Sequence, residues 1–317
     1  NVNLTNIYFA NCSASTDGSA ENHTKGGAME IIGNNTRIIN AVVEDSLAVD
    51  GGGIYWSGND GYVYNLTAVD NEAIEDGAAL YISGGNCKIL ASNFTDNVAG
   101  DDGGAIYWEG NNGTLDGSSF VHNIGTSTGD PSKPSTSKGG TLSITGNNVD
   151  ISNSNFSDSS TKNRGNENTG GAMFITGNHV NITDSSFNKC NVSHVVEPRH
   201  NHGGGSIYVE GDYGYIANCT FDQNNAKLGG AMFIQGNNAI IDDISTIRTF
   251  VPSSGGAIFV QGDNATIKNS DISMTNASVD GGAIYIHGAN TNISNTSIGM
   301  CFAYGDGGAI YVNGTDA

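Results

Sequence analysis

The stretch GGAIYWEG, from Gly103 to Gly110, decides the fold because the chain repeats variants of it eleven times. Most copies contain a glycine pair, a small residue, an apolar-aromatic-apolar run and a closing glycine. The copies begin at Gly26, Gly51, Gly77, Gly103, Gly139, Gly170, Gly204, Gly229, Gly255, Gly281 and Gly307. Successive copies start 25 to 36 residues apart, a period that is typical of stacked solenoids.

Within a copy, apolar residues alternate with other residues, as Ile106 and Trp108 do, and this period of two predicts a strand. Two further apolar anchors follow, five and ten residues after the closing glycine, as at Leu115 and Phe120. Ala68 and Thr246 break the second anchor. Three short strands per coil, turned by Gly and Asn, predict a parallel β-helix.

We therefore expect an all-β, single-stranded parallel β-helix (β-solenoid) of about eleven coils of roughly 26 residues, continuous over residues 1–317. Coils stacked about 4.8 Å apart would make a rod roughly 50 Å long. An α-solenoid would need longer helical segments than the 46 glycines allow.

Insertions interrupt this period at about residues 12–25, 124–138, 157–169 and 188–203. Three of them belong to consecutive coils and share one coil position, so we expect them to stack along one edge. Cations gather there: Lys133, Lys138, Lys162, Arg164 and Arg199. This edge is a candidate for lateral contact between molecules; the alternative is a set of solvated loops.

Composition narrows the functional classes. The net charge is -20, with only 12 Lys and Arg, which argues against nucleic-acid partners and anionic membranes. The chain as given shows no signal peptide and no apolar run long enough to span a membrane. We expect an extracellular protein without membrane insertion.

Sixteen Asn-x-Ser/Thr sequons occur, and their glycosylation candidates include Asn3, Asn22, Asn65, Asn93, Asn191 and Asn276. A repeat rich in Asn, Ser and Thr also generates sequons by chance.

Three of the five cysteines, Cys12, Cys190 and Cys301, share the coil position that Asn97 and Asn123 fill. We expect these three to be half-buried substitutes for asparagine, too far apart for a disulfide.

Two further columns follow the repeat. Asp50, Asp76 and Asp102 each precede the first glycine of a copy, and stacked carboxylates could hold Ca²⁺, the one cofactor the sequence suggests; Asp-Gly turn chemistry is the alternative. The aromatic position, as at Tyr55 and Tyr81, predicts an outward-facing stripe that stabilises by stacking and offers an interface.

The GGAI phrases at Gly103, Gly255, Gly281 and Gly307 occur with F-x-x-N at Phe94/Asn97, Phe120/Asn123 and Phe221/Asn224. Together they resemble the repeats of polymorphic outer-membrane proteins, and are similar to those of adhesin-like surface proteins of methanogenic archaea. The resemblance implies an archaeal, extracellular or cell-surface protein with a role in adhesion or envelope structure. It brings no catalytic residues.

The chain's two ends suggest self-assembly. If Asn1 followed Ala317, Val2 and Ile7 would fall five and ten residues after Gly314, at the two anchor positions. Open solenoid ends invite strand addition, so the predicted assembly ends are Val2, Leu4, Ile7, Ile310, Val312 and Gly314.

We therefore predict an extracellular structural protein that stacks head to tail into a filament, sheath or surface array, with itself as partner. The alternative is the adhesin shaft of a larger surface protein. An enzyme is not expected, although many parallel β-helices cleave polysaccharides, because the acids follow the repeat and no coil carries a distinct acid pair beside a base.

Overall fold

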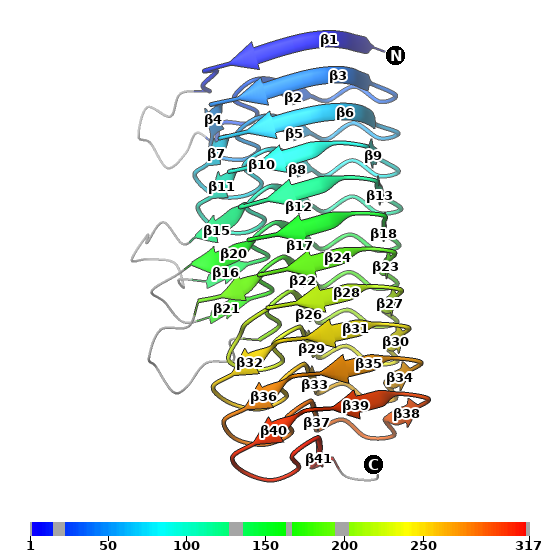
Figure 1. Ribbon diagram of the computed structural model, residues 1–317. Coiled ribbons are helices and arrows are strands. Elements are labelled where there is room, and N and C mark those ends of the chain that lie inside the picture. Colours follow the sequence, from blue (N-terminus) through cyan, green and yellow to red (C-terminus); the bar gives the residue numbers. More distant parts are fainter. Residues whose placement is uncertain (1, 15–22, 127–135, 163–166, 194–202, 315–317) are drawn as a thin grey trace.

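A computed structural model describes residues 2–14, 23–126, 136–162, 167–193 and 203–314, and these residues form strands and turns without a helix. All strand pairs are parallel, and they stack into long ladders that run from one end of the molecule to the other (Figure 1). The structure confirms the predicted parallel β-solenoid.

The first ladder, an 11-stranded sheet, takes one strand from each copy of the repeat and carries its apolar-aromatic-apolar run. Its strands are β2 (Met29–Ile31), β5 (Ile54–Trp56), β8 (Leu80–Ile82), β12 (Ile106–Trp108), β17 (Leu142–Ile144), β22 (Met173–Ile175), β26 (Ile207–Val209), β29 (Met232–Ile234), β33 (Ile258–Val260), β37 (Ile284–Ile286) and β41 (Ile310–Val312).

The second ladder, a 19-stranded sheet, carries both anchors. Three long strands span both anchors, and later coils divide each such strand in two. The strands are β1 (Asn3–Ala10), β3 (Arg37–Glu44), β6 (Tyr62–Val69), β9 (Lys88–Leu90), β10 (Asn93–Thr95), β13 (Thr114–Asp116), β14 (Ser119–Val121), β18 (Asp150–Ser152), β19 (Asn155–Ser157), β23 (Asn181–Thr183), β24 (Ser186–Asn188), β27 (Tyr215–Ala217), β28 (Thr220–Asp222), β30 (Ile240–Asp242), β31 (Ser245–Ile247), β34 (Thr266–Lys268), β35 (Asp271–Ser273), β38 (Asn292–Ser294) and β39 (Ser297–Gly299).

The third face holds a six-stranded and a three-stranded sheet, and a separate two-stranded sheet lies beside it. The strands of the third face are β4 (Leu47–Ala48), β7 (Glu72–Ala73), β11 (Val98–Ala99), β15 (Ile124–Thr126), β20 (Ser160–Lys162), β25 (Asn191–Val192), β32 (Phe250–Val251), β36 (Asn276–Ala277) and β40 (Phe302–Ala303). The remaining pair, β16 (Thr136–Lys138) and β21 (Glu167–Thr169), lies at the ends of two insertions. The C-terminal ends of these two insertions therefore pair with each other, and Ile124 and Ser160, at which the predicted insertions begin or which they include, lie on coil strands β15 and β20.

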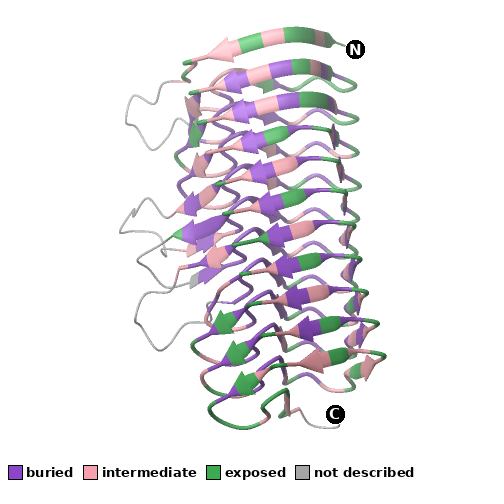
Figure 2. Ribbon diagram, in the orientation of Figure 1, coloured by how far each residue is buried: buried purple, intermediate pink, exposed green. Residues whose placement is uncertain are grey.

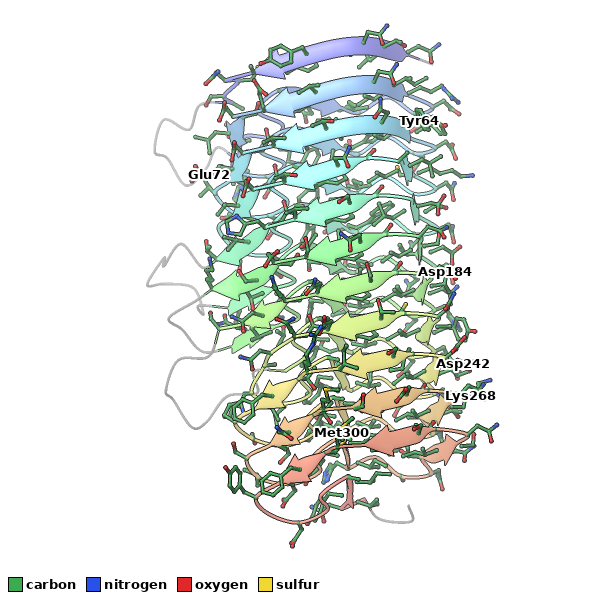
Figure 3. The ribbon with its side chains drawn as sticks, viewed as in Figure 1. Tyr64, Glu72, Asp184, Asp242, Lys268 and Met300 are labelled. Atoms are coloured by element: carbon green, nitrogen blue, oxygen red, sulfur yellow. The ribbon has the colours of Figure 1, made fainter. Side chains whose placement is uncertain are left out.

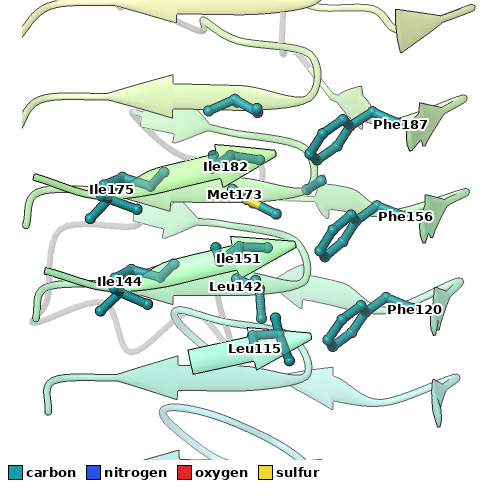
Figure 4. Packing of buried hydrophobic residues seen from close by; sticks show 14 of the residues in the cluster. Leu115, Phe120, Leu142, Ile144, Ile151, Phe156, Met173, Ile175, Ile182 and Phe187 are labelled. Atoms are coloured by element: carbon teal, nitrogen blue, oxygen red, sulfur yellow. The ribbon is translucent and has the colours of Figure 1, made fainter. Parts of the chain in front are cut away.

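A single apolar column fills the centre of the rod. Phenylalanines at the second anchor stack with ring centroids 4.7 to 5.0 Å apart and planes within 6° of parallel: Phe94, Phe120, Phe156, Phe187 and Phe221. They face the first anchor and the inward residues of the first ladder (Figure 4). Burial therefore alternates along the short strands of the second ladder, whereas several strands of the first ladder, such as β22 and β29, are buried throughout (Figure 2).

Buried asparagines add a hydrogen-bonded ladder at the edge of this core. Asn71 Nδ2 donates to Asn97 Oδ1 at 3.0 Å, and Asn97 Nδ2 donates to Asn123 Oδ1 at 2.9 Å. Cys190 continues the column, with its backbone N–H 2.8 Å from Asn224 Oδ1. Cys190 therefore takes the place of an asparagine, but it is fully buried, whereas Cys12 and Cys301 are half-buried as predicted.

Each complete coil turns at residues with a left-handed backbone, where Gly and Asn are favoured. One such set, seven residues after each closing glycine, separates the two strands that each coil gives to the second ladder, and we call it the corner column. Its members have φ between 47° and 63°: Asn6, Asn40, Asn65, Ala91, Gly117, Asn153, Asp184, Asn218, Asp243, Asn269 and Asn295.

Candidate functional site

The predicted aspartate column exists, and it lies between two lysines. Asp76 Oδ1 accepts the backbone N–H of Asp102 at 2.9 Å, and Asp102 Oδ1 accepts that of Lys138 at the same distance. At the other end, Lys25 pairs with Asp50 across the ladder. The carboxylates of Asp76 and Asp102 therefore each accept a backbone N–H of the next coil. This hydrogen bond accounts for the column without a bound ligand.

Burial shifts the acidity of this column. It raises the pKa of Asp76 to about 7, although the N–H of Asp102 counteracts the shift and nearby acids add to it. Burial, reinforced by Asp101 and Asp76, also raises the pKa of Asp102 well above its ordinary value, and the pKa of Asp50 is raised by burial and by Glu75. A desolvated carboxyl favours its neutral form.

The arrangement does not resemble a metal centre. In the part of the chain that the structure describes, no group of three or more His, Cys, Asp or Glu is placed to hold a metal ion. The hydrogen bonds to the next coil match the alternative reading of Asp50, Asp76 and Asp102 as turn residues. The calcium prediction gains no support.

The aromatic column stacks with centroid separations of 4.6 to 5.6 Å on both sides of Ser143. It is not the exposed stripe that the alternation predicted. Phe174, Tyr208 and Phe233 are only 2, 4 and 1% exposed, since Leu228 packs against them and Lys138 Nζ lies 4.8 Å from the Phe174 ring. The middle of this column is therefore a second small core.

The described residues include only part of the insertion edge. Lys138 lies on β16 and Lys162 ends β20 with an exposed side chain. Lys133, Arg164 and Arg199 lie outside the described residues, as does the sequon at Asn22. Lateral contact through this edge stays a prediction.

The register of β1 overturns the predicted phase between the chain ends. Leu4 pairs with Ile38 and Phe9 with Val43, so these two residues hold the anchor positions that counting from Gly314 gave to Val2 and Ile7. Ile7 lies opposite Ala41, and Val2 is 51% exposed. If Asn1 followed Ala317, the anchors would therefore come two residues later than the repeat requires.

The remaining predicted end residues belong to the last ladder rung. Ile310 packs against the core, and Val312 pairs with Ile286 but stays 50% exposed. Gly314 lies close to the Gly288 carbonyl, 2.6 Å from where a Cβ would stand. A side chain at Gly314 would therefore collide with the coil before it.

The predicted glycosylation sites differ in access. Asn3, Asn65, Asn93 and Asn276 have exposed side chains on strands, while Asn191 on β25 is half-buried. Where a sequon lies on a strand, as at Asn93 and Thr95, the alternation places both residues on the same outer face.

A groove that the sequence did not predict lies beside the corner column. Its volume is about 470 Å³, and it is lined by Tyr215, Ala217, Asn218, Asp242, Asp243 and Asn269. Asp184, Asp242 and Lys268 mark this edge of the rod in Figure 3. A signal was present in the sequence: Asp243 stands in a column that is otherwise mostly asparagine.

None of the described residues belongs to a helix that could cross a membrane. The architecture as a whole defines the class: a parallel β-solenoid repeat protein.

Within that class, residues 91–107 match the Chlamydia polymorphic membrane protein repeat. This match confirms polymorphic-membrane-protein-type repeats over that segment, which includes Phe94, Asn97 and the first GGAI phrase. Neither the curated proteins nor the solved structures contain a match. The archaeal resemblance stays a prediction.

Proposed function

We propose that this chain is the rigid, adhesin-like shaft of an extracellular cell-surface protein. The observation that carries the proposal is a ladder of parallel strands without a break from β2 to β41, in a chain whose residues 91–107 match a polymorphic membrane protein repeat. A continuous core gives a solenoid its stiffness, and its outer faces remain available for display.

Surface labelling tests this proposal. Antibodies raised against the folded chain should stain intact cells of the organism that encodes it, and external protease should remove the signal while a cytoplasmic marker stays intact. Staining that requires permeabilised cells would contradict a surface location.

We further propose that the shaft is not catalytic. Support comes from the most strongly perturbed carboxyls: Asp76 and Asp102 accept backbone N–H groups of the next coil. Acidic and neutral polysaccharides incubated with the protein should show no new reducing ends or unsaturated products. Cleavage that an Asp76→Asn or Asp243→Asn variant abolishes would overturn this part.

A second candidate is end-on assembly into filaments, because the parallel ladder pairing that joins one coil to the next would also join molecules at an open strand edge. Separate chains can stack head to tail even though the register of β1 shows that the repeat does not continue in phase from Gly314 to Asn1.

Negative-stain electron microscopy of native material, with mass spectrometry of both termini, separates the two candidates. Continuous fibres built from chains that end at Asn1 and Ala317 would establish assembly. Isolated rods, or peptides that extend past either terminus, would reject assembly and leave the shaft.

A further inference from the structure

The corner column follows a simple hydrogen-bonding rule. The amide of one coil donates to a side-chain oxygen of the coil before it, as Asn40 Nδ2 does to Asn6 Oδ1 at 3.1 Å and Asn65 Nδ2 to Asn40 Oδ1 at 2.9 Å. Asn218 Nδ2 donates in the same way to Asp184 Oδ1. An asparagine in this column therefore uses its donor on one neighbour and offers its oxygen to the next.

Asp243 interrupts this rule between Asn218 and Asn269. Its carboxylate has no N–H to donate to Asn218 Oδ1. Asn269 Nδ2 turns aside to Asp242 Oδ1 at 2.8 Å, and Lys268 Nζ holds the other oxygen of Asp242 at 3.2 Å. As a result, the Asn218 oxygen and the Asp243 carboxylate accept no hydrogen bond from any residue that the structure describes.

These two acceptors face a hollow in the surface. In register across the sheet, Ala217 lies between Thr183 and Asp242, and its small side chain leaves the floor of the groove open. Tyr215, half-exposed on the same strand, forms a wall. Tyr215, Ala217 and Asp242 lie on strands β27 and β30, and Asn218, Asp243 and Asn269 occupy the corner residues that directly follow β27, β30 and β34.

The chemistry of the lining selects the ligand. Two adjacent acceptors, one of them charged, require a ligand with several donors, and a carboxylate can accept two neighbouring hydroxyls at once. The nearby carboxylate of Asp242 disfavours anions. An aromatic wall next to polar groups suits a molecule with both an apolar C–H face and hydroxyls.

We propose that this groove binds a neutral saccharide, with vicinal hydroxyls on Asp243 and Asn218 and an apolar sugar face on Tyr215. Asp242, held by Lys268 and Asn269, is a positioning residue that keeps Asn269 away from Asp243. This inference goes beyond the proposed shaft function and does not depend on it, because the groove is a property of three coils.

Saturation-transfer NMR and calorimetric titration of the whole chain with methyl α-mannoside, methyl β-galactoside and N-acetylglucosamine test the proposal. At least one should bind with a Kd on the order of millimolar, as expected for a small open site. Asp243→Asn should weaken binding at least about tenfold, because it restores the amide donor and removes the charged acceptor. Ala217→Phe, which fills the hollow, should also abolish binding.

Asp263→Asn is the matched control. It removes the same charge from an exposed turn outside the groove, where Asn237 and Asn147 already show that asparagine fits. It should leave sugar binding unchanged, and thermal melts should show that all variants stay folded. No binding of any of the three sugars, binding that Asp243→Asn leaves intact, or saturable binding of Ca²⁺ or methylamine alone would each overturn the assignment.

Discussion

At the scale of single residues, some left-handed corners hold residue types that are poorly suited to a positive φ. Most corner positions hold Asn, Asp or Gly, which tolerate positive φ at little cost. Met274 and Met300 hold the same backbone at φ 54° and 53°, with side chains 48 and 72% exposed. These methionines gain no burial to compensate for the conformation.

We expect Met274→Asn to raise the free energy of unfolding by about 0.5 to 1 kcal/mol, because asparagine relieves the left-handed strain. Chemical denaturation of the two proteins measures the difference. Ile240→Asn, which changes a 37% exposed apolar residue on an extended strand, is the control and should not stabilise.

A second residue-scale prediction concerns the broken anchor. Thr246 is fully buried in the phenylalanine column, and its Oγ1 has no hydrogen-bond partner among the described residues. Thr246→Val keeps the shape and removes the unpaired hydroxyl, so it should stabilise by about 1 kcal/mol. Thr36→Val is its counterpart: Thr36 Oγ1 donates to the Gly33 carbonyl at 3.0 Å, and its loss should destabilise. Equal effects of the two changes would contradict this reasoning.

At the scale of the strand and its turn, each tryptophan is matched with a glycine five residues later. A Cβ on Gly61 would stand 2.6 Å from Trp56 Cζ2, and one on Gly113 would stand 2.4 Å from Trp108 Cζ2. Most coils with a smaller residue at the strand position carry a larger one at the turn, as with Ile144 and Val149, and the pair Val209 and Gly214 is an exception. The turn glycine makes room for the indole.

Gly61→Ala should therefore cost at least about 2 kcal/mol through overpacking, and Trp56→Ile in the same chain should recover part of that loss. Gly214→Ala is the matched control, since its Cβ would lie 3.6 Å from Val209 Cγ1, an ordinary contact. A double-mutant cycle by thermal or urea unfolding gives the coupling. Additive effects of Gly61→Ala and Trp56→Ile would reject the pairing.

At this scale the sequence predicted the strands well and their surroundings less well. The glycine repeat identified the first ladder, and Leu115 and Phe120 identified the second, because apolar alternation is a local signal. The burial of Phe174 and Tyr208 was missed, since Leu228 and Lys138, which pack against these rings, belong to other parts of the coil. The groove was missed because Asn218, Asp243 and Asn269 are separated by a whole coil and meet only after stacking.

At the scale of the whole molecule, the aspartate column makes stability depend on pH. The folded-state pKa of Asp76, about 7, lies above its ordinary value of 3.8, so between these values the folded chain binds the extra proton. This contribution to stability is fully present below about pH 4 and is lost as the pH rises through about 7. Asp50 and Asp102 shift in the same direction.

The melting temperature should therefore fall between pH 5 and pH 8 in the native chain. Asp76→Asn should raise stability at pH 8 by roughly 1 to 3 kcal/mol and by a smaller amount at pH 5, because the amide stays neutral at both. Asp280→Asn, which removes a carboxyl from the same column, is the matched control. If the pH dependence of stability is the same in Asp76→Asn as in the native chain, groups other than Asp76 cause it.

The two tryptophans have a practical consequence for anyone who follows the unfolding of this protein. Trp56 and Trp108 are the chain's only indoles, and both are buried in the N-terminal coils of the rod. Coils contact only their neighbours, so a solenoid can come apart from one end while the other end survives. Tryptophan emission would then report on the first coils alone, whereas far-ultraviolet circular dichroism would record the loss of every ladder. Two transitions that do not coincide would reveal the direction in which the rod unravels.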